Sequence, residues 1–309
     1  MRKKKVWRRL IKGFIILLIV LTCTELFLRF YLGLGHMILF REDKDFEYIP
    51  LADQNFYRWR NHIYYNHYSM RSDEVNPKSI KILGFGDSII NGGAPTDNDS
   101  LATSILSKEL SQYLDTAVQM LNISAPSWGA SNCFAYLKKY GDFNAKTIVL
   151  FVSSEDAYDN MNFIKTVGDD YHPDKNYPLA LFEAWHKYGP IILSYFTEPE
   201  NPPMPEFRTP GSQFDPGFQN FYEYCKEKNI KLIISMHPAM LERNAHKYLP
   251  EGQEIIQFVE KHNITLINEM DYPFTKDDYR GDKMHYSESG QRKLAQVLLP
   301  YLKAELSKK

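Results

Sequence analysis

Lys81-Ile-Leu-Gly-Phe-Gly-Asp-Ser-Ile-Ile90 joins a short apolar run to a turn and two polar side chains. The apolar residues before Gly86 favour strands and predict a buried β-strand. Gly84 and Gly86 allow a sharp change of direction and a close approach of the backbone. Asp87 and Ser88 therefore follow the carboxyl end of a strand, where ligands bind in open α/β sheets.

Patterns typical of strands and helices alternate from residue 80 to residue 305. Apolar runs predict further strands at 117–121, 147–152, 231–235 and 264–267. Helical spacing predicts helices near 100–113, 130–141, 215–228, 240–248, 251–262 and from 287 onward. This alternation predicts an α/β fold with a mostly parallel sheet and helices on both of its faces.

A second polar cluster, Asp282-Lys-Met-His285, lies near the carboxyl end of the chain. Its carboxylate is close enough in sequence to orient the imidazole. A serine nucleophile needs a base, and the base needs an orienting partner, so Ser88 and this cluster form a candidate relay in the order Ser, Asp, His. His237 is the main rival base, but it has no Asp three residues before it and ranks lower.

Three blocks give the chain a resemblance to the SGNH, or GDSL-type, serine esterases and lipases. They are Gly86-Asp-Ser-Ile89, then Asn122-Ile-Ser-Ala-Pro-Ser-Trp-Gly129, then Asp282-Lys-Met-His285. The resemblance covers residues 78–305 and implies a flavodoxin-like three-layer α/β/α fold. It also implies Ser88 as nucleophile, His285 as base and Asp282 as orienting acid.

The same resemblance implies that the backbone amides of Ser88 and Gly129 form part of the oxyanion hole. Gly129 precedes a predicted helix, and helix N-termini carry free amides and a positive dipole end. We also expect Asp87, Asn91 and Asp156 to line the pocket.

One position departs from the family pattern. After the strand at 147–152 the family usually carries an Asn that donates to the oxyanion, but here Glu155 takes that place. An ionised carboxylate only accepts hydrogen bonds, and losing one such donor costs about 10²–10³ in rate. Either another donor such as Asn91 or Asn132 replaces it, or Glu155 stays protonated in a dry pocket, or the protein is slow or inactive.

Composition restricts the possible partners. The 309 residues carry a formal net charge of −1, so no global basic field favours nucleic acid. No metal-ligand spacing appears, and we expect neither a metal nor an organic cofactor. The three cysteines are Cys23, Cys133 and Cys225, and for the last two a pair of buried free thiols is favoured over a disulfide.

The N-terminus predicts a membrane anchor. Basic residues between Met1 and Arg9 precede a mostly apolar run from Ile11 to about Leu32, long enough to span a bilayer. Positive charge before the span keeps the N-terminus cytoplasmic and places the rest of the chain on the far, periplasmic side. The alternative is a cleaved signal peptide, although no clean cleavage site follows the apolar core. Glu25 and Arg29 are expected to pair along the helix.

We therefore divide the chain into an anchor at 1–32, a connector at 33–79 and a hydrolase domain at 80–309. The connector is too aromatic for a flexible linker and is expected to pack on the domain as strands or loops. An insertion at about 160–212 is expected to be largely irregular, with a short helix or strand at 188–196, and to cap a substrate groove. The alternative is a surface insertion without a catalytic role. Arg71 is expected to be a structural ion-pair partner or to reach the site.

The sequence thus predicts a membrane-anchored serine hydrolase that cleaves acyl esters, with envelope glycans or lipids as substrates by analogy and location. Acyl transfer to a sugar hydroxyl is an alternative that the residues do not separate from hydrolysis. A third hypothesis is a catalytically weak or inactive protein that binds glycans or acts in envelope assembly. Glu155 is the best support for that third hypothesis.

Overall fold

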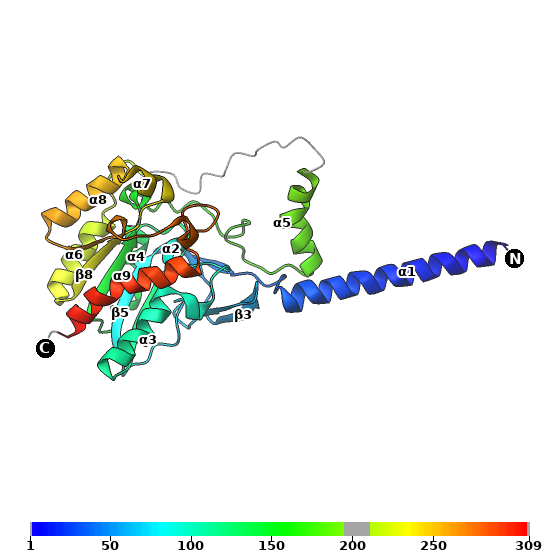
Figure 1. Ribbon diagram of the computed structural model, residues 1–309, viewed down its shortest axis with the longest axis horizontal. Helices are drawn as coiled ribbons and strands as arrows, with labels where there is room; N and C mark the ends of the chain where they lie inside the picture. The colour runs from blue at the N-terminus through cyan, green and yellow to red at the C-terminus, as the bar shows by residue number, and fades with distance from the viewer. Residues whose placement is uncertain (1, 195–210, 308–309) are drawn as a thin grey trace.

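A five-stranded parallel sheet forms the centre of the molecule, in the order β6-β5-β7-β8-β9 (Figure 1). The computed structural model describes residues 2–194 and 211–307. The strands are β5 (Ile80–Gly86), β6 (Val118–Ser124), β7 (Thr147–Val152), β8 (Lys231–Met236) and β9 (Thr265–Asn268). This is the flavodoxin-like strand order, whose direction of winding reverses beside β5. The predicted α/β class with a parallel sheet is confirmed.

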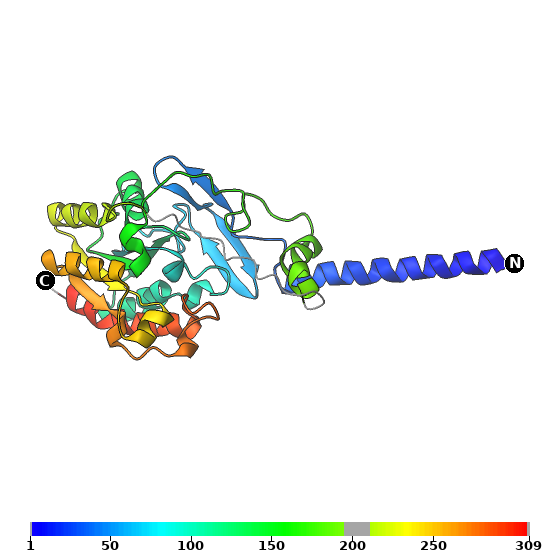
Figure 2. The ribbon, with the colours of Figure 1, turned by 90° about the horizontal axis from the view of Figure 1, so that it is seen from above.

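Helices cover both faces of this sheet (Figures 1 and 2). One layer holds α3 (Ala102–Leu114) and α9 (Glu288–Leu306), and the other holds α4 (Ala130–Tyr140), α6 (Gly217–Lys228) and α8 (Pro250–Lys261). Side chains alternate along β5, so that Leu83 and Phe85 join the core under α4 and α6 while Ile82 joins the core under α3 and α9. Both faces of β5 are buried, which explains its nearly continuous apolar sequence.

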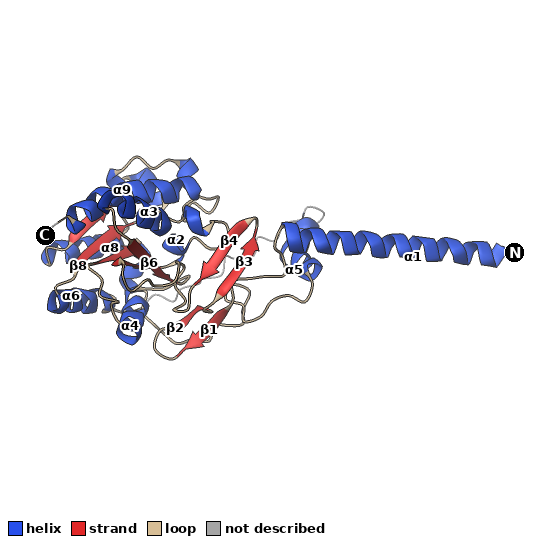
Figure 3. Cartoon of the chain, turned by 90° about the horizontal axis from the view of Figure 1, so that it is seen from below, coloured by secondary structure: helices blue, strands red, loops and turns tan. Residues whose placement is uncertain are grey.

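The connector folds into two antiparallel hairpins that lie between the N-terminal helix and the sheet (Figure 3). They are β1 (Phe40–Asp43) with β2 (Glu47–Pro50), and β3 (Gln54–Arg58) with β4 (Asn61–Tyr65). Tyr48 and Phe46 join the core on the α4 side, and Trp128 Nε1 donates to the Tyr48 carbonyl at 2.9 Å. The hairpins therefore pack on the sheet domain as strands.

Two helices have unusual features. A 3₁₀ turn at Asn98–Ser100, which Asp97 caps, precedes α3, and α3 itself begins without a side-chain cap. Pro300 lies inside α9, which runs from Glu288 to Leu306 without division. The other short helices are α2 (Ser88–Asn91) and α7 (Met240–Ala245).

The segment after β7 is more regular than expected. A 3₁₀ helix at Ser154–Tyr158 follows the strand, and α5 spans Ala180–Ser194, where we expected only a short element at 188–196. The proline-rich piece at 198–205 lies outside the described residues. Whether this segment caps a groove remains a prediction.

The N-terminal helix α1 (Arg2–Leu26) continues as a π-helix at Phe27–Tyr31 and projects away from the rest of the molecule (Figures 1 and 2). Lys4–Tyr31 is long and apolar enough to cross a membrane, and its most apolar stretch of 18 residues is not buried against the protein. The predicted pair of Glu25 and Arg29 is confirmed, with 2.8 Å between carboxylate and guanidinium.

Candidate active site

Ser88 lies at the carboxyl end of the central strand, at the point where the sheet reverses its winding. It is the first residue of α2, and the Asp87 carboxylate caps this short helix by accepting the Ile89 amide at 2.8 Å. A side chain at Gly86 would come within 3.1 Å of both the backbone and the side chain of Phe151, so any larger residue there would have to displace Phe151 slightly. The hydroxyl is thus held by rigid elements at the expected ligand-binding edge.

The structure brings the three predicted relay residues together. Ser88 Oγ lies 2.8 Å from His285 Nε2, and His285 Nδ1 lies 3.1 Å from Asp282 Oδ2. The carboxylate only accepts, so Nδ1 carries the proton toward Asp282 and Nε2 is left to accept the serine proton. Nucleophile, base and orienting acid therefore have the connections that nucleophilic catalysis needs.

Local backbone amides hold the Asp282 carboxylate. Its Oδ1 accepts the amides of Met284 at 2.9 Å and of His285 at 2.8 Å. Burial raises the pKa of Asp282, but these two amides and the nearby His285 outweigh burial and keep the pKa below its ordinary 3.8. The carboxylate is therefore ionised in the neutral range, and the loop that carries the base also orients it.

The amides proposed for the oxyanion hole differ in availability. No oxygen in the described part of the chain accepts the backbone N–H of Ser88. The Gly129 N–H, by contrast, donates to Asn132 Oδ1 at 3.1 Å. The Ser88 amide is therefore available to a bound group, whereas the amide of Gly129 is available only to a group that displaces Asn132.

Asp215 occupies the N-terminus of α4 and was not identified from the sequence. Its carboxylate accepts the Ser131 hydroxyl and, at 3.1 Å, the Ser131 amide, and it also binds the Ala130 amide. Burial raises the pKa of Asp215 in spite of these hydrogen bonds. Asp215 is 84 residues from Ser131, so no local motif could reveal this contact. The expectation of free amides at this helix end was wrong.

The two asparagines considered as replacement donors are engaged elsewhere. Asn91 Nδ2 donates to both the carbonyl and the hydroxyl of Ser124 at 3.1 Å. Asn132 Nδ2 donates to Glu47 at 2.6 Å and to the Phe46 carbonyl at 3.2 Å. Neither amide group is directed at the serine in this arrangement.

Glu155 is exposed to solvent in the 3₁₀ helix after β7. The hypothesis that places Glu155 in a dry pocket is therefore wrong, because the side chain is exposed to solvent. Its neighbour Asp156 is buried and accepts the Ser153 amide and hydroxyl. Asp87, Asn91 and Asp156 are all buried and bond to backbone groups, and their place in the lining of the pocket stays a prediction.

Two arginines hold the loop that follows the nucleophile. Arg71 is fully buried and donates to the carbonyls of Asn91 at 2.7 Å and Thr96 at 2.6 Å, so it is neither an ion-pair partner nor a site residue. Arg280 donates to the Gly92 carbonyl and to the Thr96 hydroxyl, both at 2.5 Å. Since Arg280 belongs to the loop of Asp282 and His285, it ties the nucleophile loop directly to the base loop.

The rival base His237 lies at the end of β8 and is used elsewhere. Its Nδ1 lies 3.1 Å from Glu269 Oε2 and 2.9 Å from the Tyr286 hydroxyl, and its Nε2 donates to the Met284 carbonyl at 2.9 Å. Both ring nitrogens are therefore occupied. His237 supports the backbone immediately before His285 and cannot serve as the base in this arrangement.

The Glu269 carboxylate anchors this support and is fully buried. It accepts the Ser235 hydroxyl at 2.7 Å and the Tyr286 hydroxyl, and it faces the His237 ring. Burial raises the pKa of Glu269, but the hydrogen bonds and charge of His237 outweigh burial and bring the pKa below 4.5. A buried carboxylate with such partners stabilises the fold while it is ionised.

We expect Glu269→Gln to lower stability by about 3 kcal/mol near neutral pH, because the amide offers one acceptor oxygen where the carboxylate offers two, and the buried groups that face Glu269 then lack a partner. Since the pKa of Glu269 is depressed in the fold, the contribution is fully present above the unfolded value of 4.5 and is lost as pH falls below it. Melting of the detergent-solubilised chain from pH 7 to pH 3 measures this. A melting-temperature deficit that stays constant over that range contradicts the assignment.

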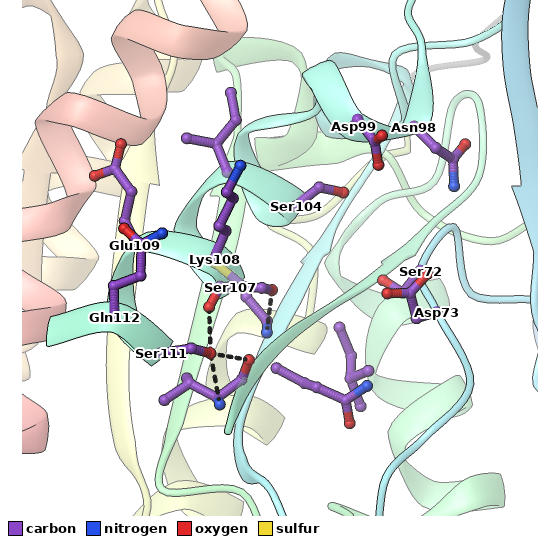
Figure 4. A pocket seen from close by; sticks show the side chains of 15 residues that line it. Ser72, Asp73, Asn98, Asp99, Ser104, Ser107, Lys108, Glu109, Ser111 and Gln112 are labelled. Carbon is purple, nitrogen blue, oxygen red and sulfur yellow. Dashed lines mark hydrogen bonds between the residues drawn. The ribbon is translucent and has the colours of Figure 1, made fainter. Parts of the chain in front are cut away.

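A polar groove of about 760 Å³ lies away from the relay, between α3 and the outer strand β6 (Figure 4). The hydroxyls of Ser107 and Ser111 accept the amides of Met120 and Val118 at 2.8 and 2.9 Å, and Ser72 accepts that of Asn122. Side-chain hydroxyls therefore accept the amides along the outer edge of β6, and these amides are no longer free to pair with another strand.

Within residues 2–194 and 211–307, no cluster of three or more His, Cys, Asp or Glu side chains is arranged to hold a metal ion. Cys133 and Cys225 are both buried free thiols, as predicted. Burial is the main reason why the pKa of the Cys133 thiol is raised, and nearby carboxylates such as Asp156 and Asp87 raise it further. This thiol is therefore inert packing beneath the site.

No protein-family model matches the chain, and no curated protein matches it either. Solved structures do match. A lipase/acylhydrolase from Enterococcus faecalis is 16% identical with a TM-score of 0.44, and the match covers 73% of this chain and 96% of the lipase/acylhydrolase chain. The structure named TesA is 12% identical with a TM-score of 0.46, and it covers 73% of this chain and 99% of its own.

An acetyl xylan esterase from Geobacillus stearothermophilus is 11% identical with a TM-score of 0.39, and it covers 75% of this chain and 97% of its own. Likeness at this level is too low to support an argument about activity. The functional proposal therefore depends on the geometry of Ser88, His285 and Asp282.

Proposed function

We propose that this chain is a membrane-anchored serine hydrolase that cleaves acyl esters. The observation that carries the proposal is the continuous relay from Ser88 Oγ through His285 to Asp282, with distances of 2.8 and 3.1 Å. The three residues come from opposite ends of the domain, 197 positions apart at the longest, so chance proximity within one loop does not explain the arrangement.

The reaction follows from these contacts. His285 Nε2 takes the proton of Ser88 Oγ as the oxygen bonds to the ester carbonyl carbon, and the carbonyl oxygen becomes an oxyanion near the Ser88 amide. Asp282 stabilises the imidazolium and keeps its tautomer. The imidazolium then protonates the departing alcohol, leaving the acyl group on Ser88. Water repeats the sequence, with His285 as base, and releases the acid.

Gly129 serves as a second oxyanion donor in this proposal if substrate displaces Asn132 from its amide. That displacement requires the Asn132 side chain to rotate and to give up its hydrogen bonds to Glu47 and Phe46, while Gly129 itself is held tightly. A Cβ added there would come within 2.3 Å of the Asp159 carbonyl. The position therefore requires glycine whether or not its amide takes part in catalysis.

The location follows from the N-terminal helix. With Lys4–Tyr31 as an uncleaved anchor and basic residues before it, the positive-inside rule places the domain outside the cytoplasmic membrane. Acyl esters on envelope glycans or lipids are the substrates that fit this placement, and a sugar hydroxyl could replace water at the second step. Product analysis with and without a glycan acceptor separates hydrolysis from transfer.

The test uses the full-length chain in detergent or nanodiscs with a series of short-chain acyl esters. We expect turnover together with covalent capture of Ser88 by a fluorophosphonate, located by mass spectrometry of the modified peptide. Capture shows an activated serine even where the preferred ester is absent from the series. Neither turnover nor labelling, in a protein that melts cooperatively, overturns the proposal.

A specific observation favours a second function, a catalytically weak protein of the same fold that binds glycan or partner proteins. Glu155 places an exposed carboxyl group where the family resemblance expects an oxyanion donor. If Glu155 lies beside the developing charge, Glu155→Asn will raise kcat by about 10–100-fold through the restored donor. Exposed Glu254→Gln is the matched control and leaves kcat unchanged. A kcat that Glu155→Asn does not alter shows that the oxyanion is stabilised without this position.

A further inference from the structure

Helix α5 presents a row of large apolar side chains to solvent. Trp185 is 64% exposed and Ile192 is 54% exposed, and Phe182, Ile191 and Leu193 are also exposed. Scattered exposed apolar residues are ordinary, but a contiguous group on one helix marks a binding surface. The mechanism uses none of these residues.

The opposite side of α5 is bound to the domain by buried charge. Glu183 is fully buried, pairs with the Arg58 guanidinium and accepts the Gly35 amide at 2.6 Å. At about 100° per residue, Trp185 and Ile192 lie about 160–200° around the helix from Glu183. The face that carries them is therefore turned away from the domain by a fixed contact.

The start of α5 is attached to the end of the membrane helix. Glu25, near the end of α1, accepts the amides of Ala180 at 3.0 Å and Leu181 at 2.9 Å. Arg29 pairs with Glu25 and donates to the Pro178 carbonyl at 2.9 Å. A carboxylate is favourable at a helix N-terminus, so this contact fixes where α5 begins relative to the span.

The two helices cross at a wide angle. In Figure 1 α5 stands across the axis of α1, and in Figure 2, turned by 90°, it is seen almost along its own axis beside the end of α1. With α1 along the membrane normal, α5 lies parallel to the membrane plane. Phe30 and Tyr31 at the end of the span are also exposed, and aromatic side chains are favoured at that depth.

We propose that α5 is an interfacial helix that docks its Trp185–Ile192 face on the outer surface of the lipid bilayer. The proposal rests on the membrane anchoring by α1 in the proposed function. The partner of this face is the boundary between the lipid headgroups and the acyl chains, where helices with one apolar face and a polar opposite face are stable. Two attachments, α1 and α5, then fix the height and tilt of the hydrolase domain, which a single helix would leave free to swing.

The experiment places the full-length chain in nanodiscs and reads the depth of single positions. Cys23→Ser removes the exposed thiol, while Cys133 and Cys225 are buried and escape labelling. Bimane is attached in Ile192→Cys and, as matched control, in Leu241→Cys, whose leucine is 74% exposed on α7 far from α1. Lipids that carry a spin label high in the acyl chain quench bimane only at the membrane.

We expect quenching at position 192 at least about threefold stronger than at position 241. Equal quenching at the two positions overturns the proposal. Another outcome is bimane at position 192 that is shielded from water without quenching. If unlabelled Ile192→Cys copies then form disulfide crosslinks, the proposal is overturned in favour of a second copy of the chain. Trp185→Ser with Ile192→Ser should lower the quenching of a probe at Phe182→Cys and leave Ser88 turnover within twofold.

Two further measurements distinguish failure of the proposed function from failure of the α5 proposal. Release of the wild-type chain by alkaline carbonate disproves α1 as an anchor and overturns the α5 proposal with it. Loss of ester turnover with the chain still membrane-bound and position 192 quenched disproves the hydrolase and leaves the interfacial helix standing.

Discussion

Ester turnover by Ser88→Ala should fall by about 10⁴–10⁶-fold, to the rate that binding and oxyanion contacts alone sustain. The change removes the hydroxyl oxygen that lies 2.8 Å from His285 Nε2, so no acyl-enzyme can form. Fluorophosphonate labelling should vanish at the same time. Steady-state turnover and intact mass with the probe measure the two effects.

The matched control is Ser104→Ala, which removes a hydroxyl from the groove beside α3 and should leave turnover and labelling unchanged. Ser88 is partly exposed, and within the described residues its hydroxyl hydrogen-bonds only to His285, so the melting temperature of Ser88→Ala should stay near that of the wild type. Turnover that survives the substitution would show that another group performs the chemistry and would end the relay hypothesis.

Asp282→Asn should lower kcat by about 10³–10⁴-fold while the folded structure persists. The asparagine carbonyl can still accept the amides of Met284 and His285, so the loop keeps its shape. Its NH₂ group, however, donates to His285 Nδ1 and moves the ring proton to Nε2. The imidazole then presents a donor to Ser88 and can no longer accept its proton.

The pKa of Asp282 is held below 3.8, so the wild-type carboxylate remains ionised from pH 5 to pH 9 and the ratio of wild-type to variant rates should not reflect its titration there. Asp277→Asn, an exposed aspartate in the same loop, is the control and should retain wild-type kcat. A loss below tenfold for Asp282→Asn would show that the backbone alone fixes the tautomer of His285.

The sequence could predict those site residues that belong to short motifs, because their neighbours in the chain reveal their chemistry. Asp282 and His285 are three apart, and the Gly86 turn places Ser88 at a strand end, so the pieces of the relay are visible in short motifs. The supporting contacts are not visible in this way. His237 with Met284, Arg280 with Gly92, and Asp215 with Ser131 join segments far apart in the chain, and each uses ordinary residue types.

The sequence by itself determined the alternating strands and helices, the apolar N-terminal span and the candidate relay, because periodicity and short spacing act through neighbours in the chain. Only the tertiary structure decided which groups remain available. In the folded chain, His237, Asn91 and Asn132 hydrogen-bond to buried partners, whereas Glu155 lies in solvent. The tertiary structure also turned the apolar face of α5 outward by burying Glu183. A buried hydrogen-bonding group must find a partner, and which one it finds depends on packing over the whole fold.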